Sequence, residues 1–150
     1  MIYLEGEDVK QAIVERLLEM FPNVAVYKEA TTNVSYPHFF VYQINLIDSD
    51  ERKDYHLLYY SMEIRYRVAS DPTTDLTLQR DLDNIALKLS QSFNIINLEG
   101  DKVRCIDKSI TKNDGVLQFY FAIQMMVKEV SDEQGTVQNT LDVQIELSNT

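Results

Sequence analysis

The chain has 150 residues, and its 24 acidic and 14 basic side chains give a formal net charge of −10. This balance argues against sequence-specific binding of DNA or RNA, because such proteins normally present a basic surface. The length suits one domain with a real core, and 45% hydrophobic residues are ordinary for a globular protein. No apolar run approaches the roughly 18 residues of a membrane span, so we expect no membrane partner. The single cysteine, Cys105, and the lack of a signal-peptide pattern indicate synthesis in the cytoplasm.

The first predicted element is an amphipathic helix, because apolar side chains recur every three or four residues from Val9 to Met20. Acidic residues at its start suit the positive end of the helix dipole, and Pro22 marks its end. A short strand is expected at Val24–Lys28, followed by a polar loop.

A long hairpin is predicted next. Pro37 opens a strand over residues 38–47, and Asp48–Asp54 is expected to be a charged loop. Apolar and polar side chains then alternate from Tyr55 to Val68, which predicts a strand with one buried face.

The second half of the sequence predicts one helix and two further strands. The helix is expected from Thr73 to Phe93, followed by a turn at Asn97–Asp101 and a strand at Lys102–Thr111. The pair Asp114-Gly115 predicts a tight hairpin turn, because both residues tolerate positive φ angles. A second long alternating strand runs from Leu117 to Lys128.

These elements predict an α+β fold in a single domain. We expect a mainly antiparallel sheet in the order α-β-β-β-α-β-β, with two helices packed on one face. The domain is expected to span residues 1–130, and residues 131–150 to form a C-terminal arm that contains one more strand. That strand carries four alternating apolar residues, Leu141, Val143, Ile145 and Leu147. It must add to a sheet edge, either that of its own sheet or that of another chain.

The sequence contains no motif of a catalytic, cofactor or metal site. It has no phosphate-binding glycine loop, GxSxG, HExxH or CxxC. His38, His56 and Asp54 could form a metal-dependent site, but we favour two ordinary sheet histidines by about ten to one. We expect Cys105 to be a buried structural thiol. We therefore predict no catalytic residue, no cofactor and no metal.

Polar and aromatic side chains on the strands predict a partner interface. Glu63, Arg65 and Arg67 share the polar face of one long strand, where ion pairing within the chain or contact with a partner would explain them. Exposed tyrosines are common at interfaces, and simple covering of the sheet explains them about equally well. The predicted interface residues are Asp48, Asp50, Glu51, Arg52, Lys53, Tyr59, Glu63, Arg65, Arg67, Tyr120, Leu141, Val143, Ile145 and Leu147.

Five segments together resemble the tail terminators (tail completion proteins) of phages and phage-tail-like particles from Gram-positive bacteria. They are FPNVAVYKE, YPHFFVYQI, YYSMEIRYR, LDNIALKL and DGVLQFYFAIQMMVKE, and they follow one another between about residue 9 and residue 130. The resemblance rests on their combination and order, since none of them is diagnostic alone.

The resemblance implies a structural protein of the virion, not an enzyme. Family members form a ring, usually of six subunits, on the head-proximal end of the tail tube. The ring stops tube polymerisation and offers a surface to the head or neck proteins and, in contractile tails, to the last sheath ring. DNA would at most pass through its lumen, which the acidic chain suits because like charges repel. Phage tail subunits are commonly linked through exchanged arms, so the resemblance slightly favours pairing of the C-terminal strand with a neighbouring subunit or sheath protein over pairing with its own sheet. The alternative is a small dimeric regulatory or ligand-binding α+β domain, and a third possibility is an enzyme that uses His38, His56 and Asp54.

Overall fold

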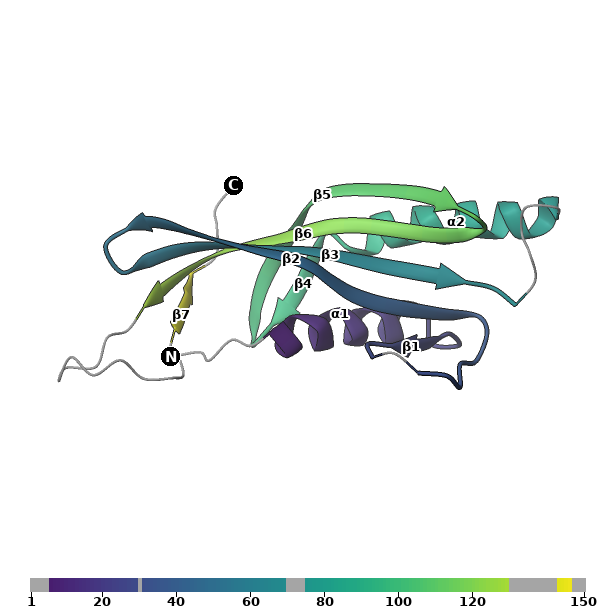
Figure 1. The fold of residues 1–150 in the computed structure, drawn as a ribbon, viewed down its shortest axis with the longest axis horizontal. Helices are drawn as coiled ribbons and strands as arrows, with labels where there is room; N and C mark the ends of the chain where they lie inside the picture. The colour runs from purple at the N-terminus through teal and green to yellow at the C-terminus, as the bar shows by residue number, and fades with distance from the viewer. Residues whose placement is uncertain (1–5, 30, 70–74, 130–142, 147–150) are drawn as a thin grey trace.

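The structure, a computed structural model, describes residues 6–29, 31–69, 75–129 and 143–146 (Figure 1). Its two helices are α1 (Gly6–Met20) and α2 (Leu76–Ser92). Its strands are β1 (Ala25–Tyr27), β2 (His38–Arg52), β3 (Tyr55–Arg67), β4 (Ile95–Leu98), β5 (Asp101–Asn113), β6 (Val116–Glu129) and β7 (Val143–Glu146). This arrangement confirms the predicted α+β class. None of the described helices is both long and apolar enough to cross a membrane.

One sheet holds the fold together, with the strand order β1-β2-β3-β6-β5-β4. β1 runs parallel to β2, and every other neighbouring pair is antiparallel. β7 pairs with the end of β6, at Met126–Glu129, where β5 has already left β6 to pair with β4. β2, β3 and β6 have 15, 13 and 14 residues, so the sheet is long and narrow.

The hydrophobic core lies between one face of the sheet, the inner face, and the two helices. Phe21, which follows α1, packs against Phe39 of β2 with ring centroids 5.0 Å apart. Phe93, the C-cap of α2, packs against Phe119 and Phe121 of β6 at 5.8 Å and 5.4 Å. All five rings are at least 95% buried. Both helices therefore cover the same face, as predicted from the alternation in β3 and β6.

Two tight turns, one between β4 and β5 and one between β5 and β6, contain residues with positive φ angles. Asp114 and Gly115 have φ angles of 51° and 76°, which confirms the predicted Asp-Gly hairpin turn between β5 and β6. Glu99 and Gly100 repeat this geometry between β4 and β5, with φ angles of 52° and 83°. β4 was not predicted, because its four residues, IINL, are too few to show a clear alternation.

The predicted charged loop at Asp48–Asp54 is wrong. β2 continues to Arg52, and only Lys53 and Asp54 form the turn before β3. Backbone pairing with β3 holds this part of β2, and Asp54 accepts a φ angle of 69°. Aspartate tolerates the left-handed region better than most residues. The paired strands reach well beyond both helices, so the hairpin tip stands apart from the core (Figure 1).

Two further predictions concern the start of helix α2 and the pairing of strand β7. Helix α2 begins at Leu76, later than predicted, because Asp75 is its N-cap and accepts hydrogen bonds from the backbone N–H groups of Thr77 and Leu78. β7 pairs with β6 of its own chain. The slight preference for pairing with another subunit is therefore not what this structure shows. Leu141 and Leu147 of the arm lie outside the described residues.

Candidate functional site

The outer face of the sheet, opposite the helices, carries a polar and aromatic cluster. Tyr42 of β2, Glu63 of β3 and Tyr120 of β6 lie side by side in the strand register. Glu63 is only 4% exposed, although it lies on the face away from the core. The Arg65 guanidinium donates to its carboxylate, with Nε 2.5 Å from Oε2, and Gln118 Nε2 donates to the same oxygen at 3.1 Å. The buried charge is therefore paired and hydrogen-bonded within the chain.

Arg65 is also held by an aromatic ring. Its guanidinium carbon lies 4.6 Å from the centroid of the Tyr42 ring. The hydrogen bond to Glu63 raises the pKa of Arg65, so the guanidinium keeps its proton and its positive charge. For Glu63 and Arg65, ion pairing within the chain is thus what the structure shows. Arg67, two residues further along β3, is exposed and remains a candidate for contact with a partner.

Tyr59 makes a second cross-strand contact on the outer face. Its hydroxyl donates to Asp107 Oδ2 at 2.6 Å, across the intervening strand β6. This hydrogen bond raises the pKa of Tyr59. Asp107 has a φ angle of 54° at the bulge of β5, which turns its carboxylate toward Tyr59. Ala122, which lies beside this contact, is 2% exposed on the same face. Tyr59 thus helps to cover the sheet. From the sequence, covering of the sheet and binding of a partner explained this residue about equally well.

The free edge of β2 is the most apolar exposed surface among the described strands. β1 pairs with β2 only at His38–Phe40, and no other described strand occupies that edge up to Arg52. Ile44, Leu46 and Ile47 are 51%, 44% and 48% exposed there. A long strand edge with unpaired backbone groups and apolar side chains is a template for pairing with another chain.

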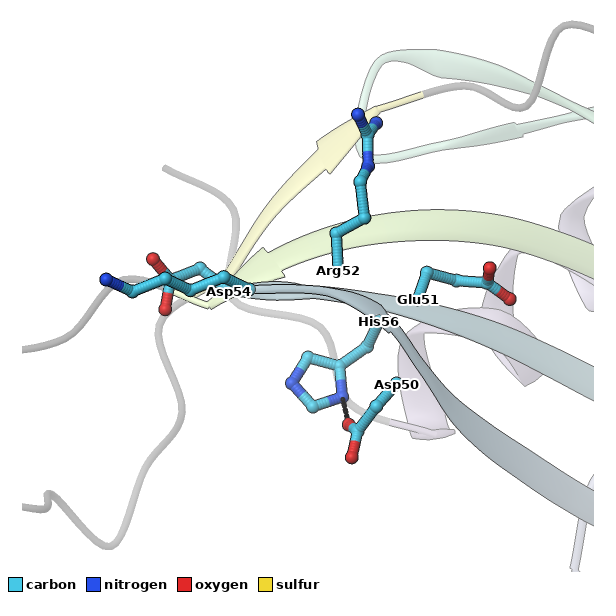
Figure 2. A pocket seen from close by; sticks show the side chains of 6 residues that line it. Asp50, Glu51, Arg52, Asp54 and His56 are labelled. Atoms are coloured by element: carbon cyan, nitrogen blue, oxygen red, sulfur yellow. Dashed lines mark ion pairs between the residues drawn. The ribbon is translucent and has the colours of Figure 1, made fainter.

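The hairpin tip gathers three potential metal ligands on its inner face. His56 Nδ1 lies 3.0 Å from Asp50 Oδ1 (Figure 2) and 2.9 Å from Asp48 Oδ1. Asp48 and Asp50 alternate along β2, and Asp50 lies directly opposite His56 of β3. The tip borders an open hollow of about 520 Å³ that is lined by Asp50, Glu51, Arg52, Lys53, Asp54 and His56.

The sequence did not predict this cluster, because it named Asp54 as the neighbour of His56. His38 is also not part of it, since it starts β2 while Asp50 and His56 lie near the other end of that strand. The two histidines are therefore separated by about 40 Å of strand. His38 is 1% exposed, and its Nδ1 lies 3.0 Å from the Ser35 carbonyl oxygen. This separation removes the geometry that the predicted alternative enzyme required.

Cys105 is a buried thiol, as predicted. It is 5% exposed in β5, and burial raises its pKa to about 12 although Lys108 and Arg16 act in the opposite direction. The sequence missed these two nearby cations, but their effect is smaller than that of burial. A thiol that keeps its proton at neutral pH is a poor nucleophile.

The comparison with known protein families decides the family. The model for the phage tail terminator protein matches residues 8–135, which is most of the chain. The chain belongs to the phage tail terminator family. No curated protein matches the sequence. One solved structure shares 15% identity and a TM-score of 0.42, and the match covers 87% of this chain and 99% of the other. That similarity is too low to support an inference.

The predicted interface residues of this tail terminator lie in separate places. Asp48, Asp50, Glu51, Arg52 and Lys53 are exposed at the hairpin tip. Tyr59, Glu63, Arg65, Arg67 and Tyr120 share the outer face. Val143 and Ile145 belong to β7, whose backbone pairs with β6. The apolar edge of β2 was missed as an interface candidate. Its signal was the run INLI before the charged tip, which breaks the alternation of a half-buried strand.

Proposed function

We propose that this tail terminator acts as a structural ring, usually hexameric in the family, at the head-proximal end of the tail tube. In this role it stops polymerisation of the tube protein and presents a joining surface to head or neck proteins. In a contractile tail the same ring also meets the last sheath ring. It acts without catalysis. The family match over residues 8–135 is the observation that carries this proposal.

The two sides of the sheet support a ring. The edge of β2 from Val41 to Arg52 is open among the described strands. On the opposite side, β4 pairs only with Asp101–Arg104 of β5, and no other described strand covers that side up to Asn113. Two unlike edges on one subunit suit head-to-tail contacts, and such contacts give a closed ring when the rotation closes.

The exposed apolar side chains of β2 are the natural contact for a neighbouring subunit. Replacing Ile47, which is 48% exposed, with lysine should leave the monomer folded because no core packing is lost. It should raise the concentration needed for ring assembly by about tenfold or more, because a charge would then have to be buried in each contact. Assembly can be followed by light scattering after size-exclusion chromatography over a range of concentrations, because rings form by mass action.

The matched control is Leu87→Lys on α2, where the leucine is 59% exposed and lies away from β2. We expect this variant to assemble like the unmodified protein. Equal assembly of the Ile47→Lys variant and the unmodified protein would rule out the β2 edge as the contact. A protein that forms only dimers at every concentration would instead favour the alternative, a dimeric ligand-binding domain.

A further inference from the structure

We propose that Asp48, Asp50 and His56 form a binding site for a divalent transition-metal ion such as Zn²⁺. The site lies at the tip of the β2–β3 hairpin. It combines one imidazole nitrogen with two carboxylate oxygens, and these donor atoms all lie within 4.8 Å of one another. Imidazole and carboxylate are both ligands of Zn²⁺, and three protein ligands leave one position for water or a further donor.

The strand register brings the three ligands together. Asp48 and Asp50 alternate on β2, so their side chains project from the same face. His56 lies opposite Asp50 on β3 and therefore shares that face. Figure 2 shows the imidazole and the Asp50 carboxylate turned toward each other on one side of the hairpin. The ligands thus come from two paired strands, and not from a flexible loop.

The distances are close to those of a tetrahedral zinc site. Ligand atoms at about 2.0–2.2 Å from Zn²⁺ stand about 3.3 Å from one another. His56 Nδ1 is 2.9 Å and 3.0 Å from the two aspartate oxygens, so small side-chain movements suffice. Asp48 and Asp50 have room to make them, because their side chains are 53% and 89% exposed.

Two neighbouring basic side chains, those of Arg52 and Lys128, lie on the other face of the hairpin. The Arg52 guanidinium carbon and Lys128 Nζ lie 5.4 Å and 5.6 Å from the centroid of the Tyr55 ring. Tyr55 precedes His56 in β3, so the two side chains project from opposite faces. The face with Asp48 and Asp50 therefore keeps a concentrated negative charge, which a divalent cation would neutralise.

Titration of the untagged protein with Zn²⁺ in a calorimeter tests the proposal. We expect saturable binding of one ion per chain, with a shift of the His56 ring signals in the NMR spectrum. Asp50→Asn should weaken binding by at least about tenfold, comparable to other losses around metal sites. This variant should fold normally because the Asp50 side chain is 89% exposed. His56→Gln should weaken binding at least as much.

Asp54→Asn is the matched control, since Asp54 lies in the adjacent turn and outside the cluster. It should bind Zn²⁺ with unchanged affinity. Absence of saturable binding at millimolar Zn²⁺ would overturn the proposal and leave the cluster as an ion pair of His56 with two carboxylates. Unchanged affinity in both Asp50→Asn and His56→Gln would overturn it as well, because the ion would then bind elsewhere.

Discussion

The buried ion pair on the outer face offers a sharp test of the packing there. Replacing Arg65 with methionine keeps much of the side-chain volume over Tyr42 but removes the charge that pairs with Glu63. The Glu63 carboxylate, whose side chain is 6% exposed, would then keep only the hydrogen bond from Gln118. Removal of one partner from a fully buried pair typically costs about 3–5 kcal/mol of unfolding free energy.

The expected cost here is smaller, because the Arg65 side chain is 35% exposed and water already screens it. We expect the Arg65→Met variant to lose about 2 kcal/mol. Glu63→Gln should lose only about 1 kcal/mol, because its amide oxygen can still accept from Gln118 and no charge is buried. The variant with both substitutions should be no less stable than Arg65→Met alone. The two losses would then fail to add, and the difference is a coupling energy of about 1–2 kcal/mol between the two residues.

Urea unfolding followed by circular dichroism, at a concentration where the protein is monomeric, measures these differences. Arg67→Met is the matched control, because Arg67 is an exposed arginine on the same strand and face. It should change the unfolding free energy by less than about 0.5 kcal/mol. Losses for the two single variants that simply add in the double variant would refute the inferred pairing, and so would an Arg67→Met variant as unstable as Arg65→Met.

Three further predictions follow from the core, one turn and the thiol. Phe93→Ala should lower the unfolding free energy by about 3–5 kcal/mol, because the fully buried ring packs on Phe119 and Phe121. Urea unfolding measures this loss, and a loss under about 1 kcal/mol would contradict the packing. Gly100→Ala should lower the unfolding free energy by about 1 kcal/mol. The loss comes only from the φ angle of 83°, because an added Cβ would meet no atom within 4 Å. An unchanged melting curve would count against that turn. Native Cys105 should resist iodoacetamide at pH 8.5, and the unfolding free energy should fall between about pH 9 and pH 12. Over that range the unfolded thiol releases its proton while the buried thiol keeps it. Comparison with Cys105→Ala isolates this contribution, and an equal pH dependence of the two proteins would disprove it.

The sequence predicts the elements that burial shapes. Alternation in β3 and β6 reports which side chains face the core, because one face of each strand packs on the helices. The distal half of β2 shows no such signal, since its DSDER segment is a strand through backbone pairing with β3 and not through burial. Short β4 likewise depends on its pairing with β5.

The candidate sites depend on the register between strands, which the sequence alone does not specify. Glutamate normally marks an exposed position, yet Glu63 is buried because pairing brings Tyr42, Tyr120 and Gln118 around it. His56 meets Asp50 because the turn is only two residues long. Because Asp48–Asp54 was predicted to be a loop, the residue that lies opposite His56 could not be predicted.

Cryo-electron microscopy of intact particles tests the central claim most directly, because it locates the chain within the tail. The proposed function predicts one closed ring of this chain at the head-proximal end of the tail tube, with subunits joined head to tail through the long sheets. Density for the chain at the distal end of the tube, or distributed along its length, would contradict the assignment as the terminator of the tail.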